Sequence, residues 1–195
     1  GSVDGAHFIG GIAGENHGII ANCTNTSSVN TTVEQNDIDL SSLTLNDLIG
    51  TENVADITDI GGIAGQSGGV IRACMNRGTV GYQHMGYNVG GIAGTNESSG
   101  MIYNCKTEGF VEGDHYVGGI VGQNIGTISY CSNTTGVNIN ASEAVDSAED
   151  LDSLTLPTAS DDEDDDAPKK ANTSTDVGGI CGFSSGVIIG CTNWG

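Results

Sequence analysis

The sequence predicts an all-β protein: a parallel β-solenoid (right-handed β-helix) of about five coils of three short strands, with two long insertions at one corner. Three observations support this prediction. A glycine-rich string returns five times, uninterrupted copies are 28 to 29 residues apart, and the segments between glycines are short and β-branched. Glycine makes up 32 of the 195 residues, well above the usual share of about 7%.

Each copy of the repeat starts with an aliphatic residue and two glycines, as in the string from Ile9 to Gly14. A further Gly follows, then an Ile two residues later and a Cys three residues after that. Parallel stacking at about 4.8 Å would place each Ile on its equivalent in the next coil. The predicted core ladder comprises Ile20, Ile71, Ile102, Ile128 and Ile188 with Cys23, Cys74, Cys105, Cys131 and Cys191.

The segments between glycines are only three to six residues long and rich in Ile and Val. Helical repeats of similar length would need longer amphipathic runs that are poor in glycine. Short β-branched segments favour strands joined by tight corners. A single coil of this size cannot bury its apolar face, so it must stack on its neighbours.

A second recurring position, two residues after each Cys, carries an amide. Stacked Asn residues suit corners, because Asn tolerates left-handed backbone and can hydrogen-bond along the stack. A ligand-facing row of amides is the alternative, and turn chemistry is the interpretation we favour. The row comprises Asn25, Asn76, Asn133 and Asn193, with Thr107 interrupting it.

Two insertions, residues 30–59 and 138–176, leave the repeat at one corner. Variable excursions from a rigid scaffold often carry function. Related apolar strings in the two insertions are therefore candidate binding loops, and simple anchoring of a loop is the equal alternative. The leucines concerned are Leu40, Leu43 and Leu45 in the first insertion and Leu151, Leu154 and Leu156 in the second. We treat residues 1–195 as one domain and expect it to be a fragment of a longer protein.

The second insertion contains an acidic loop at about residues 143–166. Its last six acids form a weak candidate for calcium, since hard cations take several carboxylate oxygens. The run lacks the turn glycine of a dedicated calcium loop, so a solvated loop is favoured. No cofactor or firm metal site is expected. The six residues are Asp161, Asp162, Glu163, Asp164, Asp165 and Asp166.

The charge balance excludes several partners. With 25 acidic and 5 basic residues, the formal net charge is −20. Nucleic-acid backbones and anionic lipids both require clustered Lys and Arg, so neither is an expected partner. No apolar run approaches the roughly 20 residues that a membrane span needs, so membrane insertion is not expected either.

Five of the six cysteines share one repeat position, and Cys181 replaces a small apolar residue. A Cys in register with Ile behaves as a small buried hydrophobe, so we expect free thiols. Disulfides between vertical neighbours are geometrically conceivable. No C-x-x-C pair is present, which argues against structural zinc.

The residues do not predict an enzyme, and no catalytic residues are assigned. Lyase chemistry on acidic sugars needs basic side chains, and the chain has only five Lys and Arg residues. Acidic residues are plentiful, so a paired-carboxylate glycoside hydrolase stays open. A carbohydrate-active β-helix, lyase or hydrolase, is thus the runner-up. Ice binding would need a flat Thr array, which the scattered Thr residues do not form.

The string G-G-I-A-G-x-N-x-G-x-I-x-x-C-x-N-x-G resembles the GLUG repeat of large bacterial surface and secreted proteins, also found near IgA-cleaving metallopeptidases. The resemblance covers the five repeats but not the insertions. It implies an extracellular, cell-surface module with a structural or adhesin-like role. The peptidase motif H-E-x-x-H is absent, so no peptidase activity is implied.

The partners expected from this reading are neighbouring domains of the same protein and a host or community glycan or protein. A solenoid without polar capping coils can also pair end to end with another copy. We therefore expect possible end-to-end self-association of the fragment.

Overall fold

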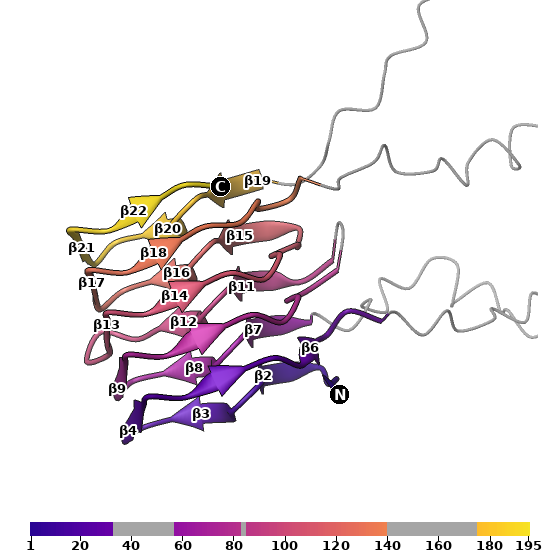
Figure 1. The fold of residues 1–195 in the computed structure, drawn as a ribbon, viewed down its shortest axis with the longest axis horizontal. Coiled ribbons are helices and arrows are strands. Elements are labelled where there is room, and N and C mark those ends of the chain that lie inside the picture. The colour runs from indigo at the N-terminus through magenta and orange to yellow at the C-terminus, as the bar shows by residue number, and fades with distance from the viewer. Residues whose placement is uncertain (33–56, 83–84, 140–174) are drawn as a thin grey trace, which may run out of the picture.

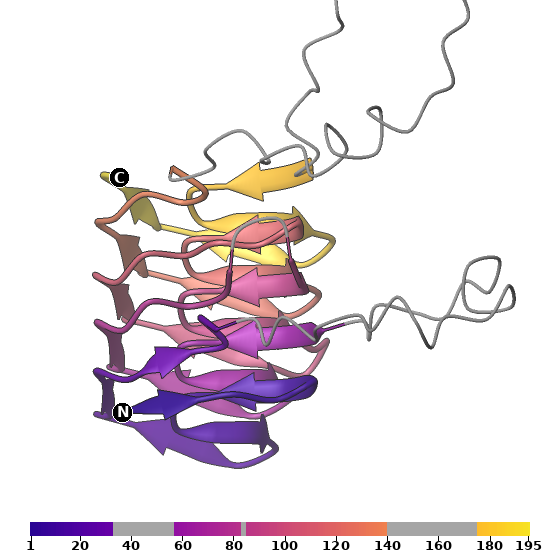
Figure 2. The same cartoon turned by 90° about the vertical axis from the view of Figure 1, so that its right-hand side faces the viewer.

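The computed structural model of the protein describes residues 1–32, 57–82, 85–139 and 175–195. Every regular secondary-structure element within these ranges is a β-strand. The strands pair in parallel and form a stack of five turns (Figures 1 and 2). The predicted parallel β-solenoid is confirmed. Each turn supplies four strands rather than the predicted three, because the two residues after each Cys also join a sheet.

Equivalent strands of successive turns form four five-stranded sheets. The first sheet contains β2 (His7–Gly10), β7 (Thr58–Gly61), β11 (Tyr87–Gly90), β15 (His115–Gly118) and β19 (Thr175–Gly178). The second contains β3 (Ala13–Asn16), β8 (Ala64–Ser67), β12 (Ala93–Asn96), β16 (Val121–Asn124) and β20 (Cys181–Ser184). The third contains β4 (Ile19–Ala21), β9 (Val70–Arg72), β13 (Met101–Tyr103), β17 (Thr127–Ser129) and β21 (Val187–Ile189). The fourth contains β5 (Thr24–Asn25), β10 (Met75–Asn76), β14 (Lys106–Thr107), β18 (Ser132–Asn133) and β22 (Thr192–Asn193).

A valine column runs up the remaining side of the stack. Strand β1 (Ser2–Val3) pairs in parallel with β6 (Ser28–Val29), one turn above it. From Val29 the column continues through single parallel bridges to Val80, Val111 and Val137. The column closes each turn before the chain returns to the first sheet.

The predicted boundaries of the insertions need a small correction. Strand β7 begins at Thr58 and β19 at Thr175, so the last residues assigned to each insertion already belong to the next turn. These residues align in register with His7 and His115 of neighbouring turns. The strands of the first sheet begin before the Gly-Gly pair of each repeat. Their backbone pairing does not depend on the side-chain type at these first positions, so the sequence pattern does not mark them.

The predicted isoleucine ladder is continuous. Ile20 pairs with Ile71, Ile71 with Ile102, Ile102 with Ile128, and Ile128 with Ile188. The three inner members are fully buried. Ile20, in the first turn, is partly buried, and Ile188, in the fifth, is 41% exposed.

The interior is divided into two apolar cores. One contains the isoleucine ladder, the cysteines and a second aliphatic column that includes Ile63, Ile92 and Ile120. The other lies between the first sheet and the valine column, and includes Ile60 and Val80. Each core is only one or two side chains wide, which is why large aromatic residues are absent from both of them.

A thin layer of glycine and amide groups separates these cores. A Cβ added to Gly62 would lie 2.3 Å from Cγ of Asn76, so only glycine lets the two sides of the turn come this close. Asn76 is fully buried and donates from Nδ2 to the Gly78 carbonyl while Oδ1 accepts from the Gly78 N–H. Asn25, Asn76 and Asn133 of the asparagine row are therefore buried turn residues, as favoured from the sequence, whereas Asn193 in the last turn is exposed.

All six cysteines are free, and the five of the repeat stack in one column. The N–H of Cys105 donates to Sγ of Cys131, and that of Cys131 to Sγ of Cys191, each over 3.4 Å. Burial raises the pKa of Cys74, and burial raises the pKa of Cys181 to about 12. These thiols pack as small apolar groups, in agreement with their position beside the isoleucines.

Candidate binding groove

The residue before the aliphatic start of each repeat adopts left-handed backbone. Phe8, for example, has φ of 52°, while its neighbours His7 and Ile9 pair in regular register with Thr58 and Ile60. Such a conformation lifts the side chain out of the ladder, and it is uncommon for residues other than Gly, Asn and Asp. The equivalent residues, with φ between 52° and 59°, are Phe8, Asp59, Asn88, Tyr116 and Asp176.

A glycine column in the second sheet accommodates this backbone. A Cβ on Gly94 would lie 2.5 Å from the carbonyl carbon of Asp59, one turn below. The same close approach brings Gly122 against Asn88. Because the glycines add no side chains, a depression remains between the left-handed column and the outward column of the second sheet.

The second sheet provides the other wall. Its outward side chains stack in register on a rigid frame, one per turn, at the spacing of neighbouring parallel strands. They are Glu15, Gln66, Thr95, Gln123 and Phe183.

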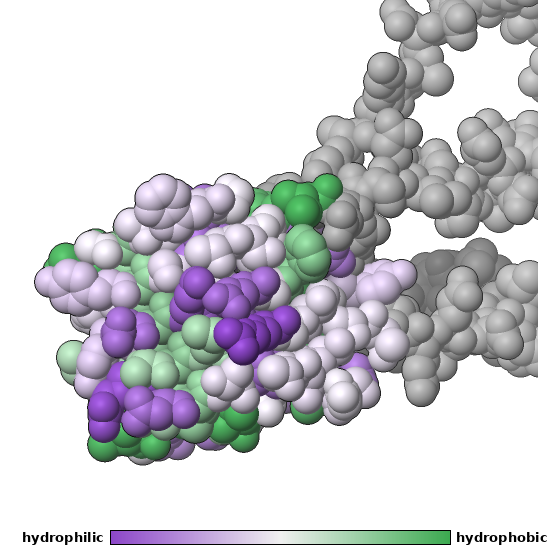
Figure 3. Space-filling model, viewed as in Figure 1, coloured by the Kyte–Doolittle hydropathy of each residue, from purple (hydrophilic) through white to green (hydrophobic). Residues whose placement is uncertain are grey.

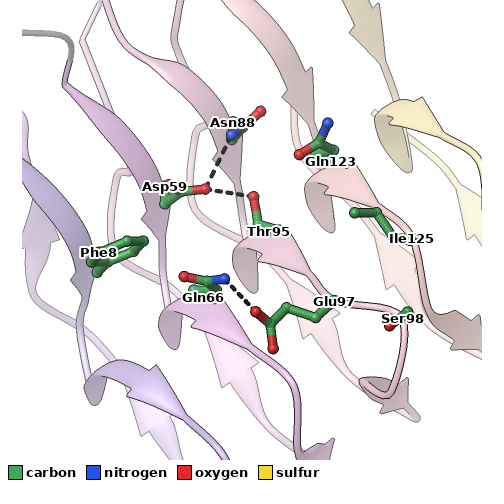
Figure 4. A pocket seen from close by; sticks show the side chains of 9 residues that line it. All are labelled: Phe8, Asp59, Gln66, Asn88, Thr95, Glu97, Ser98, Gln123 and Ile125. Carbon is green, nitrogen blue, oxygen red and sulfur yellow. Dashed lines mark hydrogen bonds between the residues drawn. The ribbon is translucent and has the colours of Figure 1, made fainter.

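One hydrogen bond joins the two walls at the centre of the groove, and two others fix side chains, one within each wall (Figure 4). Oδ1 of Asp59 accepts from Oγ1 of Thr95 over 2.5 Å and from Nδ2 of Asn88 over 3.0 Å. Nε2 of Gln66 donates to Oε1 of Glu97 over 2.5 Å. The polar groups are thus held in fixed positions before any ligand arrives.

The depression has a volume of about 500 Å³ and crosses several turns. Its lining is mostly carboxylate, amide and hydroxyl, with an aromatic ring near the first turn and an aliphatic side chain toward the fourth. The lining residues are Phe8, Asp59, Gln66, Asn88, Thr95, Glu97, Ser98, Gln123 and Ile125.

Aromatic rings continue the same two columns above the depression. Tyr116 of the left-handed column packs on Phe183 of the second sheet, with ring centroids 5.5 Å apart and an angle of 51° between the rings. Phe8, at the other end, is 40% exposed. The groove face therefore combines central polar groups with accessible rings at its ends.

Among the described residues, no lysine or arginine lines the groove. Arg77 and Lys106 instead flank Glu108 near the fourth sheet, with N–O distances of 2.9 Å and 2.6 Å. Hydrogen bonds from Lys106 and then Arg77 lower the pKa of Glu108. Asp59 and Glu97 place two acidic side chains in the lining of the groove.

The sequence-predicted binding leucines, Leu40, Leu43, Leu45, Leu151, Leu154 and Leu156, lie outside the described residues, as do the acids from Asp161 to Asp166. Among the residues that the structure describes, no group of three or more His, Cys, Asp or Glu side chains is placed to hold a metal ion. No helix in the same residues is long and apolar enough to cross a membrane.

Sequence reasoning missed the left-handed column. Its members share a backbone conformation but not one side chain: three are Asp or Asn, and the other two are Phe8 and Tyr116. The only signal was their fixed place before each Ile-Gly-Gly or Val-Gly-Gly string.

Comparison with known proteins gives no match: no family model, no curated protein and no solved structure matches this chain.

Proposed function

We propose that the protein is a non-enzymatic structural and adhesive module of a bacterial cell-surface or secreted protein. The observation that carries the proposal is the groove, in which side chains recur once per turn on a rigid, in-register scaffold. A repeating surface of this kind suits an extended ligand that is itself repetitive. The resemblance of the repeat to GLUG sequences supports the extracellular setting and the attachment to neighbouring domains.

The ligand class that best fits the groove is a neutral glycan. Asp59 and Glu97 accept hydrogen bonds, while Asn88, Gln66 and Gln123 can both donate and accept them, as sugar hydroxyls require. Exposed Phe8 offers an apolar face on which a sugar ring can stack. The described lining contains acidic but no basic side chains, which disfavours uronates and other acidic polymers. The two insertions remain proposed as additional binding elements at the neighbouring corner.

The runner-up is a carbohydrate-active enzyme, because two carboxylates line the same depression. Glycoside hydrolysis uses a pair of carboxyl groups on either side of the bond to be cut. In the present groove, however, Asp59 is engaged by Thr95 and Asn88, and Glu97 by Gln66. These bonds favour a role in ligand positioning over one in proton transfer.

Binding and turnover distinguish the two proposals. On a glycan array we expect saturable binding to neutral oligosaccharides of glucose, mannose or galactose. No reducing ends should be released from these sugars. Gln66→Ala and Gln123→Ala should each weaken binding about fivefold, the value of one hydrogen bond. Both variants leave the left-handed column unchanged.

Ser129→Ala is the matched control, because Ser129 lies outward in the third sheet, away from the groove. It should bind like the wild type. Absence of binding to all neutral glycans would overturn the groove proposal. Turnover lost in both Asp59→Asn and Glu97→Gln would establish the enzymatic alternative instead.

A further inference from the structure

The connection between the second and third sheets is two residues longer in the third turn than in the other four. In those four turns a single residue stands between the end of the second-sheet strand and the glycine that precedes the third-sheet strand. In the third turn, Glu97, Ser98 and Ser99 occupy this interval. The loop 97–100 therefore interrupts an otherwise regular corner. The single residues of the other turns are His17, Gly68, Ile125 and Ser185.

The loop 97–100 is folded as a tight turn and is held against the second turn of the solenoid. The N–H of Gly100 donates to the carbonyl oxygen of Glu97 over 2.8 Å, which closes the tight turn. The N–H of Glu97 donates to the carbonyl oxygen of Ser67 over 2.9 Å. Oγ of Ser99 donates to the carbonyl oxygen of Gly68 over 2.8 Å. These bonds fix the position of the loop before any ligand arrives.

Glycines of the neighbouring turns make room for the loop. A Cβ on Gly68 would lie 2.2 Å from Oε2 of Glu97 and 3.3 Å from Oγ of Ser99. Side chains of the loop thus occupy the space that a side chain of the second turn would need. In the fourth turn, a Cβ on Gly126 would lie 2.3 Å from the carbonyl oxygen of Glu97. The loop is therefore packed tightly between the second and the fourth turns.

The loop extends the second-sheet wall of the groove. Glu97 and Ser98 both line the depression, and Nε2 of Gln66 donates to Oε1 of Glu97 over 2.5 Å (Figure 4). Asp59 lies in the left-handed column on the other side. The groove is thus bordered on both sides at the second and third turns, whereas in the fourth turn the corner has only the single residue Ile125.

We infer that the loop 97–100 determines which neutral glycans the groove accepts: it admits unbranched chains and excludes chains with a branch on the sugar bound beside Glu97. The inference rests on the proposed glycan binding and adds its specificity. A sugar between Asp59 and Glu97 has protein on two sides, so a branch on that sugar would collide with the loop. Because hydrogen bonds and close packing hold the loop in place, it cannot move aside at low cost, and a rigid steric barrier of this kind produces selectivity.

The face over the fourth sheet provides a control for the place of binding (Figure 3). Strongly hydrophilic residues gather near the middle of this face. Arg77 and Lys106 flank Glu108 near the fourth sheet. A glycan bound on that face would contact these charged groups and not the loop 97–100, so Arg77→Ala distinguishes binding there from binding in the groove.

Titration calorimetry of the full 195-residue chain with linear and branched glycans tests the inference. The probes are short linear chains of mannose, glucose or galactose, each with and without single-sugar branches. The wild type should bind a linear chain about tenfold more tightly than its branched counterpart. Deletion of Ser98 and Ser99 gives this corner the length of the fourth-turn corner and should reduce the preference to about twofold or less. Arg77→Ala should bind both chains like the wild type.

Ser99→Ala is a second variant, which keeps the length of the loop. Ser99 does not line the groove, but its hydroxyl holds the loop against Gly68. Its loss should lower the preference for linear chains about threefold, because the loop can then yield to a branch. Ser185→Ala is the matched control: Ser185 is exposed at the same corner in the fifth turn and does not line the groove, so the preference should be unchanged. Circular dichroism checks that each variant retains its strands.

Equal affinity of the wild type for linear and branched chains would overturn the role of the loop and leave glycan binding in place. A full preference for linear chains in both the shortened loop and Ser99→Ala would have the same meaning. Failure of the wild type to bind any of the linear chains would overturn the proposed function together with this inference. Loss of binding in Arg77→Ala would place the glycan on the fourth-sheet face and contradict both.

Discussion

Nδ2 of Asn25 donates to Oδ1 of Asn76 in the next turn over 2.9 Å, in the layer that separates the two apolar cores. The same bond links Asn133 to Asn193 higher in the stack. Thr107 lies between these pairs, fully buried, and its Oγ1 has no hydrogen-bond partner within the described residues. The amide ladder is therefore broken at one known place.

Thr107→Asn should repair this break and stabilise the protein. A Cβ on Gly91 would lie 2.4 Å from Oγ1 of Thr107, and a Cβ on Gly62 would lie 2.3 Å from Cγ of Asn76. The space around residue 107 is therefore similar to the space around Asn76. An amide at 107 could bond to Asn76 and Asn133, which we expect to raise the free energy of unfolding by about 1 kcal/mol. Chemical denaturation measures the change.

The control for this substitution is Thr24→Asn, at an exposed outward position of the same sheet. It should change the free energy of unfolding by less than about 0.5 kcal/mol. A loss of stability in Thr107→Asn would show that the amide does not fit the layer.

Gly94→Ala should destabilise the turn that carries the groove. Its methyl group would lie 2.5 Å from backbone atoms of Asp59 and Ile60, which cannot rotate away. We expect a loss of about 3 kcal/mol, at the upper end for an overpacked interior. In Gly18→Ala the methyl group would meet only Oδ1 of Asn16 at 4.0 Å, so thermal unfolding of that variant should match the wild type closely.

The raised pKa of Cys105 makes stability fall in alkali. Contact with the Cys131 thiol and burial raise the pKa of Cys105 far above its ordinary value of 9.0. Above that value the unfolded chain loses the proton and the folded chain keeps it, so the free energy of unfolding decreases as the pH rises. Cys105→Ala should be less stable at pH 7 but show a shallower decline above pH 9. Equal slopes for the two proteins would contradict this assignment.

Glu108 has the opposite dependence. Lys106 and Arg77 lower the pKa of its carboxylate, so its stabilising contribution is present above the ordinary value of 4.5 and is lost as the pH falls through the lowered one. Glu108→Gln should therefore flatten the acid limb of the melting temperature against pH. Because the group is exposed, high salt should reduce the difference between variant and wild type.

The architecture could be predicted because its main signal is spacing. Ile102 and Ile128 are 26 residues apart because one turn of the solenoid lies between them, and this spacing makes them neighbours in the core. The fourth strand was missed because two residues such as Thr24–Asn25 are too short for an alternating pattern. A second buried polar row, in which Asn16 donates to Oγ of Ser67, was also missed, although an Asn at that position recurs in the repeat.

The groove could not be predicted in the same way. Phe8, Asp59 and Tyr116 occupy one column because their backbone shares a conformation, and glycines of the next turn leave room for it. No single residue type is required there: the column holds Asp and Asn as well as aromatic residues. Such freedom is what allows one scaffold to present different side chains along one face.

The division of the interior into two cores has a mechanical consequence. The two apolar cores run side by side along the stack and are joined only by a thin layer of glycine and amide groups. The stack should therefore resist bending more strongly in the plane that contains both cores than perpendicular to that plane. Thermal bending of the stack should therefore be anisotropic, with the groove face flexing more readily in one direction than in the other.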